Sequence, residues 1–74
     1  MNNYIATFFS HYDALVFCDH LKRQGIKAKM MPVPRKVSSS CGTCVSFATD
    51  LEINYDGYEI DAIYVERHGS FVKL

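Results

Sequence analysis

The strongest pattern in the sequence is an apolar stripe at helical spacing within residues 11 to 24. Four apolar residues recur there at steps of three and four, namely Ala14, Phe17, Cys18 and Leu21. Ser10 stands where an N-terminal helix cap belongs, and Gly25 is a typical helix stop. Because the stripe covers only one side, the helix must pack against another element, and Cys18 is expected to be a core residue.

Short strand-like segments stand on both sides of this helix. Residues 4 to 9 are rich in β-branched and aromatic side chains, which favours a buried first strand. Residues 26 to 31 alternate apolar side chains with lysines, as in a half-buried strand. Further strands are expected over residues 45 to 48 and 59 to 66.

The segment that follows Asp50 allows two structures. A short helix can run over residues 51 to 56 and end at Gly57, or an alternating strand can lead into a hairpin turn at residues 56 and 57. With the helix, the element order is β-α-β-β-(short α)-β, which is the ferredoxin-like split βαβ arrangement. We therefore predict an α+β fold with an antiparallel sheet and helices on one face. The tail over residues 68 to 74 either extends the last strand or frays.

Composition narrows the classes of function. The chain has 74 residues, so we expect one small domain over residues 1–74, with a thin core. Eight basic residues balance eight acidic ones, and nucleic-acid partners, which need a basic face, are not expected. No apolar run is long enough for a membrane, and the start lacks a signal peptide, so we expect a cytoplasmic location. Chains of this size rarely enclose a deep pocket, which favours a carrier, binding module or partner subunit over an enzyme.

The segment from residue 32 to 44 calls for a functional explanation. Arg35 and Lys36 precede Cys41, and cations near a thiol favour the thiolate, which is its nucleophilic form. Gly42 leaves the approach to this sulfur open. We predict a reactive-cysteine loop with Cys41 as the thiolate. The residues expected to position or activate it are Pro32, Pro34, Arg35, Lys36, Ser40 and Gly42.

Cys41 and Cys44 also form a C-x-x-C spacing, which suits a redox disulfide or half of a zinc site. In the redox hypothesis Cys44 is the resolving thiol. There is no second C-x-x-C and the three histidines are scattered, so neither a metal nor another cofactor is expected. If the cysteines are incidental, the chain is an interaction domain, and an exposed final strand would also suit a homodimer.

The loop resembles that of a known family. Pro32-Val33-Pro34-Arg35 followed by Ser38-Ser39-Ser40-Cys41-Gly42 is similar to the loop of the bacterial family described as putative selenium/sulfur carrier protein-like. The resemblance covers residues 4 to 66 and departs at Cys44, where an apolar residue is expected. It implies a carrier that holds sulfur or selenium on Cys41 as a persulfide or selenenyl sulfide. Its partners would be donor and acceptor enzymes.

Overall fold

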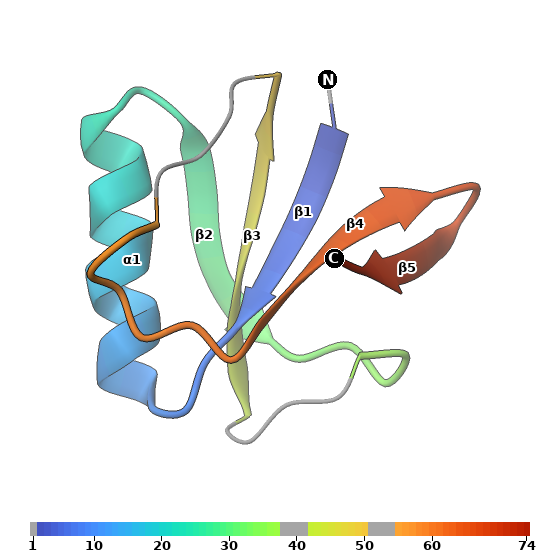
Figure 1. Ribbon diagram of the computed structural model, residues 1–74, viewed down its shortest axis with the longest axis horizontal. Helices are drawn as coiled ribbons and strands as arrows, with labels where there is room; N and C mark the ends of the chain where they lie inside the picture. Colours follow the sequence, from blue (N-terminus) through green and yellow to red (C-terminus); the bar gives the residue numbers. More distant parts are fainter. Residues whose placement is uncertain (1, 38–41, 51–54) are drawn as a thin grey trace.

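The computed structural model describes residues 2–37, 42–50 and 55–74 (Figure 1). In this part of the chain there are one helix and five strands, in the order β1 (Asn2–Thr7), α1 (His11–Arg23), β2 (Lys27–Pro32), β3 (Thr43–Thr49), β4 (Ala62–Arg67) and β5 (Ser70–Lys73). All strand pairs are antiparallel, and the strand order across the sheet is β2-β3-β1-β4-β5. The helix packs on one face of the sheet, so the predicted α+β class is confirmed.

Local sequence signals explain where α1 begins and ends. At its start the backbone amide of Asp13 donates to the Ser10 hydroxyl oxygen (3.2 Å), and this hydroxyl donates to the Asp13 carboxylate (2.8 Å). At its end the amide of Gly25 donates to the carbonyl of Lys22 (3.0 Å), with a φ of 80° at the glycine. A glycine takes this left-handed conformation at little cost, which makes it a good helix stop. The helix predicted over residues 11 to 24 is therefore confirmed.

The main core lies between α1 and the sheet. Its buried members are Ala6, Phe8, Ala14, Phe17, Cys18, Leu21, Ile26, Val45 and Phe47. Phe17 is fully buried at the centre, with its ring centroid 5.6 Å from that of Phe8 and 6.0 Å from that of Phe47. Cys18 is also buried, as its place on the apolar stripe predicts. We call this side of the sheet the covered face.

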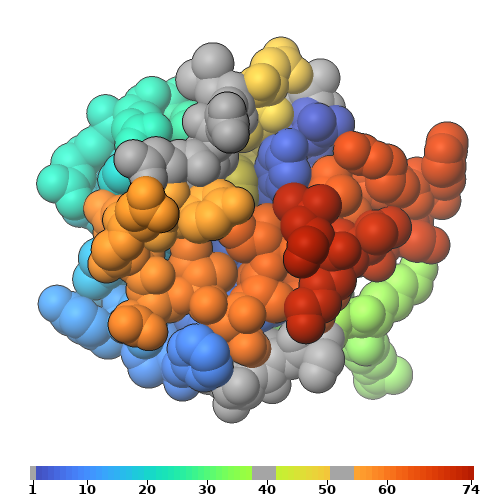
Figure 2. Space-filling model, in the orientation of Figure 1, coloured from blue at the N-terminus to red at the C-terminus, as the bar shows by residue number. Residues whose placement is uncertain are grey.

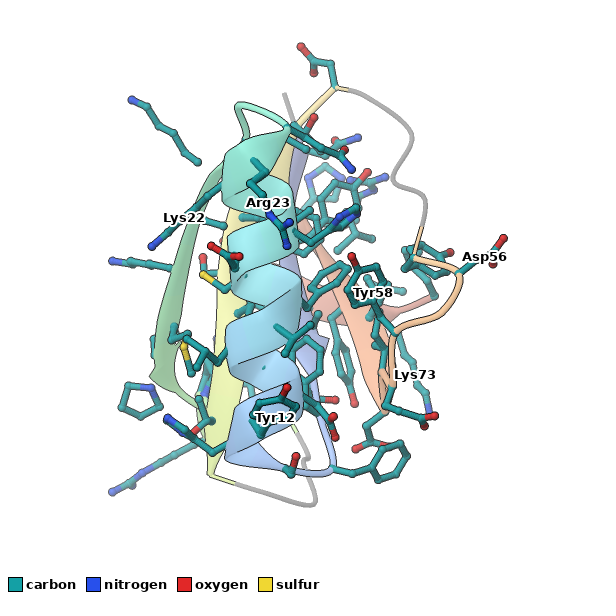
Figure 3. The ribbon with its side chains drawn as sticks, turned by 90° about the vertical axis from the view of Figure 1, so that its left-hand side faces the viewer. Tyr12, Lys22, Arg23, Asp56, Tyr58 and Lys73 are labelled. Carbon is teal, nitrogen blue, oxygen red and sulfur yellow. The ribbon has the colours of Figure 1, made fainter. Side chains whose placement is uncertain are left out.

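An irregular segment over residues 55–61 packs against α1 (Figure 2). The Tyr58 ring lies 4.5 Å from the His20 ring and 5.6 Å, edge-on, from that of Phe17, centroid to centroid. Figure 3 shows Tyr58 directed at the helix. Most of the predicted short helix falls on residues 51–54, which lie outside the described residues, and residues 55–61 are not helical. The ferredoxin-like arrangement, which needs that second helix, therefore stays a prediction.

The C-terminal part of the chain differs from the sequence-based expectations. β4 is paired on both edges, since its Tyr64 lies opposite Ile5 of β1 and opposite Lys73 of β5. It therefore forms no hairpin across residues 56 and 57. The tail neither extends β4 nor frays, because it turns back at His68 and Gly69 to form β5. Both turn residues have positive φ, 52° and 81°, as in a two-residue hairpin turn whose twist matches the strands.

The second face of the sheet, which we call the open face, lies away from α1. Strand alternation and pairing place Thr7 of β1 opposite Cys44 of β3 on this face, with Ile5 beside them. These three side chains are buried, although none belongs to the main core cluster. The open face therefore has a small buried patch of its own at the end of β3 where the cysteine loop enters.

Candidate functional site

The cysteine loop, residues 33–42, joins β2 to β3. Its two ends are held together because the Val33 amide donates to the Gly42 carbonyl (3.2 Å). Within it, the Val37 amide donates to the Pro34 carbonyl (3.0 Å), which closes a tight turn after the second proline. Residues 38–41, which include the predicted Ser40 and Cys41, lie outside the described residues. Cys41 therefore directly precedes Gly42, whose carbonyl accepts the hydrogen bond that closes the base of the loop.

Two side chains fix the first half of the loop. Val37 is buried, with 5% of its surface exposed, although it follows the exposed Arg35 and Lys36. The Lys36 ammonium lies 3.5 Å from the Gly69 carbonyl in the β4–β5 turn. Figure 2 shows the loop residues beside this hairpin at one side of the molecule. The loop is thus supported by a strand pair that is far from it in sequence.

The residues predicted to position or activate the thiol are distributed around this loop. Arg35, Lys36 and Gly42 are exposed, and apart from Gly42 and its chain neighbours no atom of the described residues lies within 4 Å of the place where a Cβ on Gly42 would stand. Pro32 is exposed at the end of β2, and Pro34 is half-buried. The described part of the loop therefore combines the exposed side chains of Arg35 and Lys36 with open space beside Gly42. That these cations lower the pKa of a thiol stays a prediction.

The two described cysteines are buried on opposite faces of the sheet. Cys44 is fully buried on the open face, and its sulfur lies 3.8 Å from the Pro32 carbonyl oxygen. Cys18 is 3% exposed and belongs to the side of α1 that packs on the covered face. A resolving thiol must be accessible to attack, so the burial of Cys44 disfavours the redox hypothesis.

Sequence reasoning missed two contacts that position the loop. One is the link between Lys36 and the β4–β5 turn, since no strand was expected at residues 70–73. The other is at the start of α1, where the His11 Nδ1 lies 3.3 Å from the Thr43 hydroxyl oxygen. This contact brings the helix N-terminus beside the end of the cysteine loop. Neither contact has a local signal, because each joins residues more than thirty positions apart.

The described residues offer little for a metal or a membrane. Within residues 2–37, 42–50 and 55–74, no three His, Cys, Asp or Glu side chains lie together as ion ligands. In the same part of the chain, no helix has the length and apolar character needed to cross a bilayer.

Comparison with known proteins gives one result. Residues 3–64 match the model of the family described as putative Se/S carrier protein-like. The matched region includes the whole cysteine loop and ends within β4, before the turn that leads to β5. No curated protein and no solved structure matches the chain.

Proposed function

Because this chain belongs to the putative Se/S carrier protein-like family, we propose that it holds a sulfur or selenium atom on Cys41 and passes it between partner enzymes. In this function the chain is an accessory protein and not a stand-alone enzyme. A donor enzyme loads the atom and an acceptor enzyme removes it. The proposal places the chain in the reducing cytoplasm, where thiols stay free of disulfides.

The observation that supports Cys41 is the burial of the other two thiols. A carrier thiol must meet the active sites of two different proteins, so it needs an accessible position. Cys18 is buried between α1 and the sheet, and Cys44 is buried on the open face. Cys41 is the remaining cysteine of the chain, and it is attached next to the exposed Gly42 at the closed base of the loop.

The proposed transfer is a thiol exchange without an added oxidant. The Cys41 thiolate attacks the terminal sulfur of a persulfide on the donor's cysteine. A bond forms between the Cys41 sulfur and that terminal atom, the donor's sulfur–sulfur bond breaks, and the donor cysteine leaves as a thiolate. Unloading is the same step in reverse direction, with an acceptor thiolate attacking the terminal atom and Cys41 leaving. Selenium passes in the same way, through a selenenyl sulfide.

In this mechanism the loop lowers the cost of holding an anion. Arg35 is exposed in the first half of the loop, and Lys36 already spans from the loop to the Gly69 carbonyl. We assign both cations to stabilising the thiolate or the persulfide anion, together with Ser40 and the backbone amide of Gly42. Pro32 and Pro34 limit the conformations that the loop must give up when a partner binds.

Intact mass spectrometry tests this proposal. The reduced protein is incubated with a cysteine desulfurase and cysteine, and in parallel with a selenocysteine lyase and selenocysteine. We expect the wild type to gain one chalcogen atom, and Cys41→Ser to gain none. Cys18→Ser and Cys44→Ser are the matched controls and should load as the wild type does. Equal loading of Cys41→Ser would exclude the proposed site.

The same spectra distinguish the redox hypothesis. If Cys41 and Cys44 form a catalytic disulfide, the wild type loses two hydrogen atoms on oxidation and either single variant prevents the loss. If no sample changes mass, an interaction domain remains. Both outcomes contradict the carrier proposal.

A further inference from the structure

The outer edge of β2 pairs with no other strand in the described part of the chain. Among the described strands, β2 pairs only with β3, and it stands at the end of the sheet order. In Figure 3 its ribbon runs along the left of the molecule, beyond α1, with no other ribbon outside it. An edge strand of this kind presents backbone N–H and C=O groups that another extended chain can use. Pro32 limits that use, because it has no N–H, so pairing is confined to residues 27–31.

The side chains of β2 differ between its two faces. Lys27 and Lys29 lie on the open face, opposite Ala48 and Ser46 of β3, and both are exposed. The alternate residues Ala28 and Met30 point to the covered face and pack against the main core. A strand added to this edge therefore meets cations on one side and apolar groups on the other.

The lysines also stand at the rim of a groove on the open face. This groove has a volume of about 220 Å³, and its polar lining consists of Lys27, Lys29, Ser46 and Asn3. None of the residues that line it is acidic. The acidic residues described near it are Asp50, which lines a neighbouring hollow together with Lys27, and Glu66 of β4, whose carboxylate accepts a hydrogen bond from the Asn3 amide (3.3 Å). Carboxylates that reach over the β2 edge would enter a positively charged part of this face.

We propose that β2 is the docking edge for an extended, acidic segment of a partner protein, in which acidic and apolar side chains alternate. The acidic side chains pair with Lys27 and Lys29 over the groove, and the apolar ones extend the covered face beside Ala28 and Met30. Cross-strand pairs of opposite charge stabilise such an added strand, whereas like charges directly opposite destabilise it. The edge of a second copy's β2 is therefore disfavoured, since it would bring lysines opposite lysines.

The location of this edge connects it with the carrier chemistry. β2 runs directly into the cysteine loop at Pro32, and the next residue, Val33, is hydrogen-bonded to Gly42 beside Cys41. A segment docked along residues 27–31 thus lies next to the loop that a donor or acceptor must reach. The identity of the partner as such an enzyme rests on the proposed function, whereas the docking edge itself does not.

An NMR titration tests the docking edge. The probe is the peptide acetyl-Glu-Val-Glu-Val-Glu-Val-amide, added to the full-length, isotopically labelled protein. We expect amide shift changes over residues 27–31, weakening as salt is raised, with the amides of β5 unchanged. The Lys27→Glu/Lys29→Glu double variant should bind this peptide at least about tenfold more weakly and should prefer the corresponding Lys-Val peptide. Both lysines are exposed, so the variant is expected to fold, and Lys27→Gln/Lys29→Gln is the alternative.

The controls separate this edge from other surfaces. Lys22→Glu, an equally exposed change on α1, should leave the affinity within about twofold. Shift changes confined to β5 or α1, or an affinity that does not respond to charge reversal on β2, would overturn the proposal. So would equal shifts caused by inorganic polyphosphate, because they would indicate a general anion surface. Loading of Cys41 from inorganic polysulfide needs no partner, so it tests the carrier proposal independently of the peptide.

Discussion

The two faces of the sheet differ in how many side chains they bury. The covered face packs the rings of Phe8, Phe47 and Tyr58, from three parts of the chain, around the buried Phe17. The open face buries only a small patch around Cys44, leaves the β2 lysines exposed, and lies where the cysteine loop meets the sheet. The contrast indicates that the covered face supplies most of the stability of the fold.

The largest effect should come from the centre of the covered face. Phe17→Ala removes a ring that is fully buried and contacts the rings of Phe8, Phe47 and Tyr58. We expect a loss of about 3–5 kcal/mol in the free energy of unfolding, which is a large part of the total stability of a small domain. Urea denaturation measures it. Phe9→Ala is the matched control, because Phe9 is 55% exposed. A comparable loss in this variant would show that the stability does not depend on the buried rings of the covered face.

A smaller effect is expected where the loop meets the rest of the molecule. Val37→Ala removes two buried methyl groups, and we expect a loss of about 1–2 kcal/mol. Its local result is sharper, since the Val33 amide at the base of the loop should exchange with solvent faster in native-state hydrogen exchange. If the exchange of this amide does not change, Val37 does not hold the loop.

The cap of α1 should matter less than a core ring, although it supports the same face. Ser10→Ala removes the acceptor for the Asp13 amide and the donor to its carboxylate. We expect a loss of about 1 kcal/mol, measured by thermal or urea unfolding. Ser10→Asp keeps an acceptor at the cap and should recover most of this loss; no recovery would assign the effect to something other than capping.

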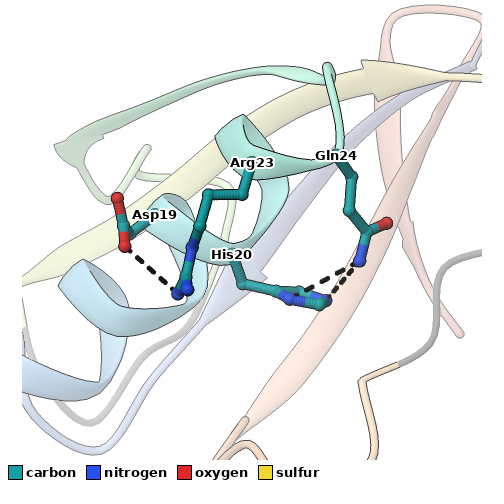
Figure 4. A network of polar contacts seen from close by, with 4 residues as sticks. All are labelled: Asp19, His20, Arg23 and Gln24. Atoms are coloured by element: carbon teal, nitrogen blue, oxygen red, sulfur yellow. Dashed lines mark hydrogen bonds and ion pairs between the residues drawn. The ribbon is translucent and has the colours of Figure 1, made fainter.

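The smallest effect is expected on the outer side of α1. Asp19 and Arg23 form an ion pair of 3.2 Å, with side chains that are 63% and 69% exposed, beside the contact of Gln24 with His20 (Figure 4). Exposed pairs of this kind contribute little because water and salt screen them. Asp19→Ala should change the free energy of unfolding by less than about 0.5 kcal/mol. If the free energy of unfolding changes as much as it does in Ser10→Ala, the exposed side of α1 contributes to stability as much as the helix cap does.

The covered face could be predicted from the sequence because its signals are local. Ser10 and Gly25 mark the ends of α1, and the spacing of its apolar residues identifies the buried side. The strands predicted at 26 to 31 and 45 to 48 correspond to β2 and β3 within two residues at each end. Each of these features depends on residues within about one turn or one strand of each other.

The surroundings of the loop were less predictable for a physical reason. β5 depends on a turn in which His68 takes a positive φ, whereas the usual sequence signals of such a turn are Asn-Gly, Asp-Gly and Gly-Gly. The contact of Lys36 with Gly69 depends in turn on that hairpin. The burial of Cys44 depends on the pairing of β3 with β1, so its C-x-x-C spacing alone could not show it.

The carrier proposal requires that one of the three cysteines be reactive in the folded chain. Native protein is treated with limiting iodoacetamide, and peptide mapping follows the modification of each cysteine over time. We expect Cys41 to be alkylated first, and Cys18 and Cys44 to react only after urea unfolds the chain. Alkylation of Cys44 at the rate of Cys41 in the native state would contradict the proposal, because the fold would then fail to distinguish the carrier thiol from its neighbour.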